Sequence, residues 1–190
     1  MHFGQVANFK TNSNLPIEKF PIALNSNLKS SIKIKEAEEV DLRFHSRLNC
    51  KKKTYRYIIN NSPYGTAIYR YLETHIPQKL NVEKMKKAVK YFIGEHDFKA
   101  FKASGTSSKS SVRTIYDAKI YQNGDKIYIE LTGNGFLYNM VRIIAGTLVE
   151  VGLEKIEPEK IEEIIKEGKR ENAGKTLPPN GLYLVDVKYE

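Results

Sequence analysis

The sequence contains a single cysteine, Cys50, among its 190 residues. One cysteine excludes an intrachain disulfide framework and a thiolate metal site, and it makes a reducing cytoplasm the expected compartment. We expect Cys50 to be a small buried side chain rather than a nucleophile.

Residue patterns that bind metals or nucleotide cofactors are also missing. No spacing typical of metal ligands is found among the four histidines, His2, His45, His75 and His96. No glycine-rich phosphate loop opens a helix, and no serine lies in a sharp strand-to-helix turn. The sequence therefore predicts no metal site, no nucleotide cofactor and no nucleophilic triad.

Long apolar runs are scarce. The longest lies around residues 140–151, but it is interrupted by Arg142 and is too short to span a bilayer. The sequence also predicts no signal peptide. We therefore expect a soluble cytoplasmic protein with no membrane partner.

Basic residues are in excess: 31 lysines and arginines stand against 22 aspartates and glutamates, giving a formal net charge of +9. Such a balance favours a polyanionic partner. A surface stabilised by networks of lysine and glutamate is the alternative, and mixed stretches such as "EPEKIEEIIKEGKRE" fit it. Composition alone leaves both explanations open.

The chain divides into a short first block and a longer second block, with a predicted domain boundary between residues 40 and 41. The first block predicts a strand at residues 5–9, a short helix that ends near Asn25, and a strand at residues 31–40. These elements cannot easily cover their own apolar faces. The first block therefore reads as an incomplete α+β unit.

The second block predicts the order strand, helices, strand, strand, helix, helix, strand. Its clearest elements are a strand at residues 53–60, a helix between Asn81 and Gly94, and a hairpin that turns at Asn123 and Gly124. An apolar helix follows from about residue 137 to residue 151, and Pro158 begins another. This order is typical of an α+β domain with a largely antiparallel sheet and helices on one face.

Arg142 requires an explanation because it lies within the apolar helix "FLYNMVRIIAGTLVEVG". A buried guanidinium is costly unless an anion is near. Glu150, the nearest acid in that helix, lies more than two turns away and cannot pair with it. The partner must be a carboxylate of another segment or a phosphate, unless the side chain reaches the helix edge and water.

Tyr55 lies in "KKKTYRYIIN", a predicted strand that directly follows three lysines. Aromatic side chains interleaved with cations suit an unstacked nucleobase and its phosphates. Packing within the sheet is the alternative role for a strand tyrosine. Further basic residues, each a weak signal alone, are His45, Arg47, Lys109 and Arg113.

Seven motifs of the chain occur together in the order and spacing of one known family. They are "GQVANF", "FHSR", "KTYRYII", "GEHDFKAF", "VRTIY", "GNGFLYNMVRIIAGTLVEVG" and "GLYLVDVKY", and they extend from Gly4 to Tyr189. In this combination the chain resembles the TruA-type tRNA pseudouridine synthases. The resemblance implies two ferredoxin-like α+β halves, with mixed, mainly antiparallel sheets around a central cleft, in a protein that works as a homodimer.

The resemblance also implies an activity, which is the isomerisation of uridine to pseudouridine at positions 38, 39 and 40 in the anticodon stem-loop of tRNA. In this family the nucleophile is an aspartate in a segment of the form GRTDxGVHAxGQV. Aligning "FGQVANF" with that segment places the aspartate about four residues before Met1. The 190 residues are therefore expected to be a fragment, truncated just after the aspartate motif and inactive by themselves.

Individual residues acquire expected roles from the same resemblance. Arg142 matches the basic residue that pairs with the nucleophilic aspartate, and Tyr55 matches the tyrosine that stacks on the target base and can assist a proton transfer. Leu184 matches an apolar residue that lines the pocket. His45, Arg47, Lys109 and Arg113 are expected to contact the tRNA, and neither metal nor organic cofactor is implied. The alternative is a non-catalytic RNA-binding α+β module.

Overall fold

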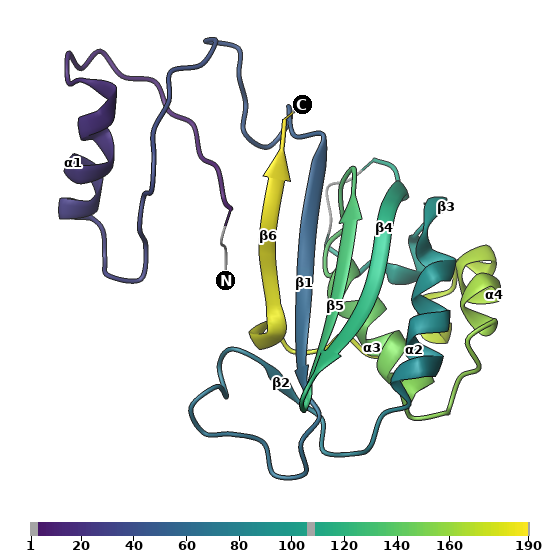
Figure 1. Ribbon diagram of the computed structural model, residues 1–190. Coiled ribbons are helices and arrows are strands. Elements are labelled where there is room, and N and C mark those ends of the chain that lie inside the picture. The colour runs from purple at the N-terminus through teal and green to yellow at the C-terminus, as the bar shows by residue number, and fades with distance from the viewer. Residues whose placement is uncertain (1–3, 106–108, 190) are drawn as a thin grey trace. The chain divides into compact units, whose positions relative to one another are not determined.

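The computed structural model describes residues 4–105 and 109–189, and these form two compact units (Figure 1). The smaller unit comprises residues 6–49, and the larger comprises the chain from Cys50 onward together with residues 4 and 5. His2 lies outside the described residues. The domain boundary between residues 40 and 41 stays a prediction, because the compact units report packing and not the extent of the family's two halves.

The smaller unit contains one short α-helix, α1 (Phe20–Asn27), preceded by a 3₁₀ turn, η1 (Ile17–Lys19). No residue of α1 is buried. The strands predicted at residues 5–9 and 31–40 are wrong, since the described residues of both segments are irregular. A strand-like pattern becomes a strand only where a neighbouring backbone completes the hydrogen bonds, and neither segment pairs with a strand among residues 4–105 and 109–189.

The larger unit is built on a six-stranded mixed sheet with the order β2-β1-β5-β4-β3, in which β6 also pairs with β1. Its strands are β1 (Lys52–Asn60), β2 (Thr74–His75), β3 (Gly94–Asp97), β4 (Val112–Asn123), β5 (Lys126–Gly133) and β6 (Leu182–Lys188). Strand β1 runs antiparallel to β5 and β6 and parallel to β2. The expected α+β class is confirmed, and so is the β4–β5 hairpin. Its turn is wrong by one residue: Asn123 pairs with Lys126, so the two turn residues are Gly124 and Asp125, and of the predicted pair only Gly124 has a positive φ.

The helices of this unit lie together on one side of the sheet (Figure 1). They are α2 (Val82–Ala88), continued by the 3₁₀ segment η2 (Val89–Phe92), α3 (Met140–Gly152) and α4 (Lys160–Glu167). Asn81 caps α2 as predicted, because its side chain accepts a hydrogen bond from the backbone of Lys84 at 3.1 Å. Helix α3 starts at Met140 rather than near residue 137, since Asn139 takes a left-handed conformation that ends the preceding loop.

The core lies between the sheet and α3. Tyr57 and Ile59, on one face of β1, are completely buried, as the period of two predicts. Every residue of α3 is buried except Arg142 and Glu150. A helix this apolar can only be an internal element, and its first turn carries one cation into the interior of the fold.

Candidate uridine site

Arg142 lies in the first turn of α3 and is half-buried. Its Nε donates to the backbone oxygen of Leu177 at 2.6 Å, and its Nη1 donates to Oδ1 of Asn139 at 2.8 Å. Both acceptors are neutral. Within residues 4–105 and 109–189, no aspartate or glutamate oxygen lies within 4.0 Å of the guanidinium. The described residues thus hold the arginine but do not neutralise it.

Tyr55 and Leu184 are direct neighbours on adjacent strands, because Tyr55 of β1 pairs with Leu184 of β6. A register shift next to Tyr55 locally interrupts the regular pairing of the two strands. The ring of Tyr55 packs edge-on against Phe136, with 5.2 Å between the ring centroids. Two of the residues expected to line one pocket are therefore brought together, and Phe136 joins them.

The phenol of Tyr55 is kept neutral by its surroundings. Burial raises its pKa, and the neighbouring Cys50 raises the pKa further. A neutral phenol can stack on a base and can donate or accept a hydrogen bond, but it is not a standing anion. Cys50 itself is half-buried, so the expectation of a buried side chain is wrong.

Tyr57, two residues along the same face of β1, connects this region to the arginine. Its hydroxyl donates to the backbone oxygen of Pro178 at 2.6 Å and lies 2.5 Å from Oγ1 of Thr74. Since its one proton goes to Pro178, Thr74 donates to it. Pro178 follows Leu177, so two consecutive carbonyls are bound, one by Arg142 and the next by Tyr57.

Burial raises the pKa of Tyr57 to about 12, against the lowering influence of the Thr74 hydrogen bond and the Arg142 charge. The unfolded chain loses this proton near pH 10, so the contribution to stability is complete below pH 10 and disappears as pH rises through about 12. We expect the free energy of unfolding of Tyr57→Phe to decline less than that of the parent above pH 10. Urea unfolding of the parent and the variant below and above pH 10 measures the two declines, and equal declines would contradict the prediction.

The predicted phosphate-contacting residues are spread over both units. Arg113 on β4 is half-buried, and a Cβ added to Gly135 would lie 3.6 Å from its Nε, so Arg113 borders the loop that carries Phe136. Lys109 is exposed. His45 and Arg47 are exposed in the smaller unit, where Nδ1 of His45 accepts from the Arg47 backbone at 3.2 Å.

Sequence reasoning missed Phe136, Tyr57 and Asn139. Phe136 and Asn139 lie within the motif "GNGFLYNMVR", directly before the arginine, and this proximity was the available signal. Tyr57 is two residues from Tyr55, but its link to Arg142 passes through Leu177 and Pro178, which are distant in sequence. No local pattern could reveal that link.

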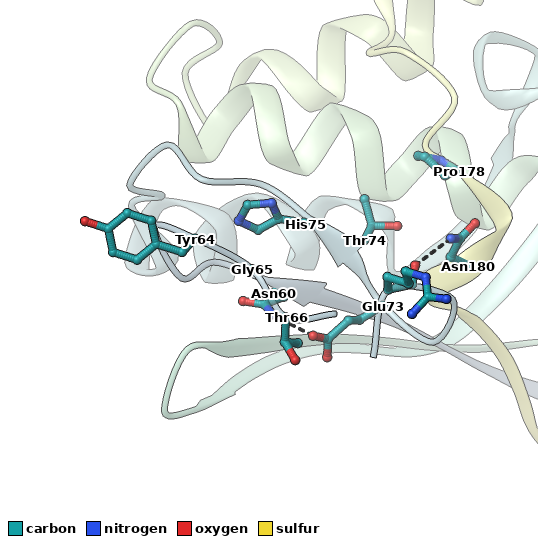
Figure 2. A pocket seen from close by; sticks show the side chains of 10 residues that line it. Asn60, Tyr64, Gly65, Thr66, Glu73, Thr74, His75, Pro178 and Asn180 are labelled. Atoms are coloured by element: carbon teal, nitrogen blue, oxygen red, sulfur yellow. Dashed lines mark hydrogen bonds between the residues drawn. The ribbon is translucent and has the colours of Figure 1, made fainter. Parts of the chain in front are cut away.

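A separate pocket of about 320 Å³ lies at the end of β1, and Figure 2 shows the side chains around it. None of the predicted site residues lines it. Its one carboxylate, the buried Glu73, accepts from Asn60 at 2.6 Å and pairs with Lys126 at 2.9 Å. Its lining residues are Asn60, Tyr64, Gly65, Thr66, Arg70, Glu73, Thr74, His75, Pro178 and Asn180.

Two further properties of the described chain bear on its partners. No helix there combines the length and the apolar character that a membrane crossing requires. No group of three or more His, Cys, Asp or Glu side chains in those residues could hold a metal ion.

Comparison with known proteins places the chain in a family. A family model described as tRNA pseudouridine synthase matches residues 88–190. The tRNA pseudouridine synthase A of Acetivibrio thermocellus is 51% identical over 186 residues, which cover 98% of this chain and 76% of that protein. That of Thermoanaerobacter sp. strain X514 is 52% identical over 185 residues, with 97% and 76% covered. The chain therefore belongs to the tRNA pseudouridine synthase A family of isomerases.

Proposed function

We propose that the polypeptide to which these residues belong converts uridine to pseudouridine at positions 38, 39 and 40 in the anticodon stem-loop of tRNA, at a site formed by Arg142, Tyr55 and Leu184. The observation that carries the proposal is the state of Arg142. It is a half-buried cation in an otherwise apolar helix, held by two neutral acceptors and matched by no acid of the described residues. Such a group is poised for an anion that comes from elsewhere.

The anion in this proposal is the nucleophilic aspartate, supplied by a segment outside the 190 residues. Gly4 supports it, because this residue aligns with the last glycine of the family's aspartate motif. Gly4 lies against β6, and a Cβ added there would meet the backbone oxygen of Val185 at 2.9 Å. The chain at the end of that motif thus passes beside the strand that carries Leu184.

The chemistry requires these residue types. The aspartate carboxylate attacks C1′ of the ribose and displaces N1 of uracil, the base turns, and C5 displaces the carboxylate from C1′, after which C5 loses its proton and N1 gains one. The aspartate must stay ionised to attack, and a paired arginine lowers its pKa. The detached uracil needs an apolar and aromatic enclosure, which Tyr55, Phe136 and Leu184 would provide.

Binding of tRNA in this proposal relies on the basic residues. Arg47, Lys109 and Arg113, with His45, would contact phosphates, and the affinity would fall as salt rises. The protein would work in the cytoplasm as a homodimer of subunits with two ferredoxin-like halves, divided near residue 40. The reaction calls for neither metal nor organic cofactor.

Release of tritium from tRNA labelled at uridine C5 tests the proposal. The 190-residue chain should release none above background but should bind tRNA in a salt-dependent manner. A polypeptide in which the family's aspartate segment precedes Gly4 should be active, and its Asp→Asn variant should not. Turnover by the 190 residues alone would show that the nucleophile lies within them. A folded, tRNA-binding but inactive longer polypeptide would favour a non-catalytic RNA-binding module.

A further inference from the structure

The guanidinium of Arg142 is only partly used by the protein. Nε and one N–H of Nη1 are taken by Leu177 and Asn139. In the part of the chain that the structure describes, Nη2 has no acceptor. Every buried side-chain nitrogen or oxygen there has a partner, so an Nη2 without an acceptor cannot be buried. It is therefore accessible to an incoming group. The two occupied positions fix the plane of the guanidinium, so they also fix the direction of the open edge.

We propose that Asn139 and Tyr57 are positioning residues, which aim the open edge of Arg142 at the carboxylate it pairs with. This inference rests on the proposed function, in which that carboxylate is the nucleophile. Asn139 acts on the guanidinium directly, and Tyr57 acts on it through the Leu177–Pro178 segment.

The side chain of Asn139 does not cap the helix that follows it. It occupies the N-cap position of α3, where an asparagine side chain normally accepts a hydrogen bond from the first turn of the helix. Here its side chain makes no such bond and accepts from Nη1 of Arg142 instead. The backbone of Asn139 is left-handed, with φ 60°, whereas an N-cap residue typically adopts the β region. The side chain of Asn139 therefore orients the guanidinium of Arg142 instead of capping the backbone of α3.

Tyr57 holds the other acceptor in place. The Nε of Arg142 depends on the carbonyl of Leu177, and the next carbonyl, of Pro178, is bound by the Tyr57 hydroxyl. Proline fixes its own φ, so holding one of these carbonyls restricts the other. Tyr57 is completely buried and cannot touch a tRNA base. Its hydroxyl is instead placed to act on the reaction through the segment that holds Arg142.

Asn139→Gly isolates the positioning role, because glycine keeps the left-handed backbone and removes only the acceptor. In an active polypeptide that carries these residues, we expect kcat to fall about 10-fold, since small misplacements of catalytic groups cost this much or more. KM should stay within about twofold, because Asn139 contacts the arginine and not the tRNA. Tyr57→Phe should act in the same direction.

The pH profile separates positioning from a merely structural role. Activity falls as pH drops through the pKa of the nucleophile, and a well-aimed arginine lowers that pKa. In both variants the acid limb of kcat/KM should therefore move to higher pH, by about one unit, the lower end of the effect of a neighbouring arginine. A loss of folded protein would scale the whole profile without moving the limb.

Asn180→Ala is the matched control. It removes one hydrogen bond, from Nδ2 of Asn180 to the Arg70 backbone at 2.9 Å, from the same segment without touching Arg142. Its acid limb should coincide with that of the parent. A second readout uses the Nε–Hε NMR signal of Arg142 in the 190-residue chain, which should lose protection from hydrogen exchange in Asn139→Gly.

The outcomes distinguish this inference from the proposed function. Unmoved acid limbs in both Asn139→Gly and Tyr57→Phe, with Arg142→Ala inactive, would overturn the inference alone. Full activity of Arg142→Ala would overturn the assigned site and the inference with it. If Asn139→Gly failed to fold, the limb of Tyr57→Phe would decide the matter by itself.

Discussion

Arg142→Lys should lower kcat/KM for pseudouridine formation about 10²-fold, and Arg142→Ala about 10³-fold, the range found when one preorganised charged or hydrogen-bonding group is lost. Lysine keeps the charge but lacks the planar guanidinium. A single ammonium group cannot hydrogen-bond the carbonyl of Leu177, the amide oxygen of Asn139 and an external carboxylate at the same time. Initial rates of tritium release with the active polypeptide measure the loss. Affinity for tRNA should change little, because in the proposed site the arginine pairs with the aspartate rather than with a phosphate.

Arg56→Lys provides the matched control for this result. Arg56 is also half-buried and lies next to Tyr55, but it already has an acid of its own, with Nε of Arg56 2.6 Å from Oε1 of Glu130. Its replacement should weaken stability and leave kcat/KM within about twofold, since the charge of Arg56 is already matched by Glu130. Equal losses for the two arginines would mean that Arg142 matters only for folding.

The unusual position of Arg142, half-buried in an apolar helix, could be predicted from the sequence because its signal is local. A helix whose own residues are apolar on every face must be internal. A single cation within such a helix therefore needs an explanation in any fold. The buried face of β1 and the β4–β5 hairpin, whose turn contains the predicted Gly124, are local in the same sense. Each follows from a periodicity or from the backbone demands of a tight turn.

The remaining features depend on partners that the sequence does not place. Residues 31–40 alternate like a strand, but alternation shows only that a segment could pair. Conversely, β2 and β3 are too short to leave a pattern, and they form because neighbouring strands offer hydrogen bonds. The link from Tyr57 to Arg142 through Leu177 and Pro178 is of this second kind.

Gly146→Ala should destabilise the protein by about 3 kcal/mol or more, at the upper end of overpacking costs. Gly146 lies in α3 where the segment before β6 crosses it, and an added Cβ would sit 1.8 Å from the backbone oxygen of Lys175. Gly174 makes the reciprocal approach, with its Cβ position 2.6 Å from the backbone of Gly146. The atoms in conflict are backbone, so the crossing segment itself must move.

Gly152→Ala, in the same helix, is the control that separates this steric conflict from the general effect of alanine in a helix. Its added Cβ would meet the sulfur of Met85 at 2.7 Å, and a methionine side chain can turn aside. Since alanine also stabilises a helix by about 0.5–1 kcal/mol relative to glycine, the net change in the free energy of unfolding of Gly152→Ala should be small. Urea unfolding of both variants measures the difference, and equal stabilities would mean that the crossing segment is loosely held.

A tight crossing matters to the site because Lys175 lies two residues before Leu177, whose carbonyl holds Arg142. Displacing that segment should therefore move the arginine as well as weaken the fold.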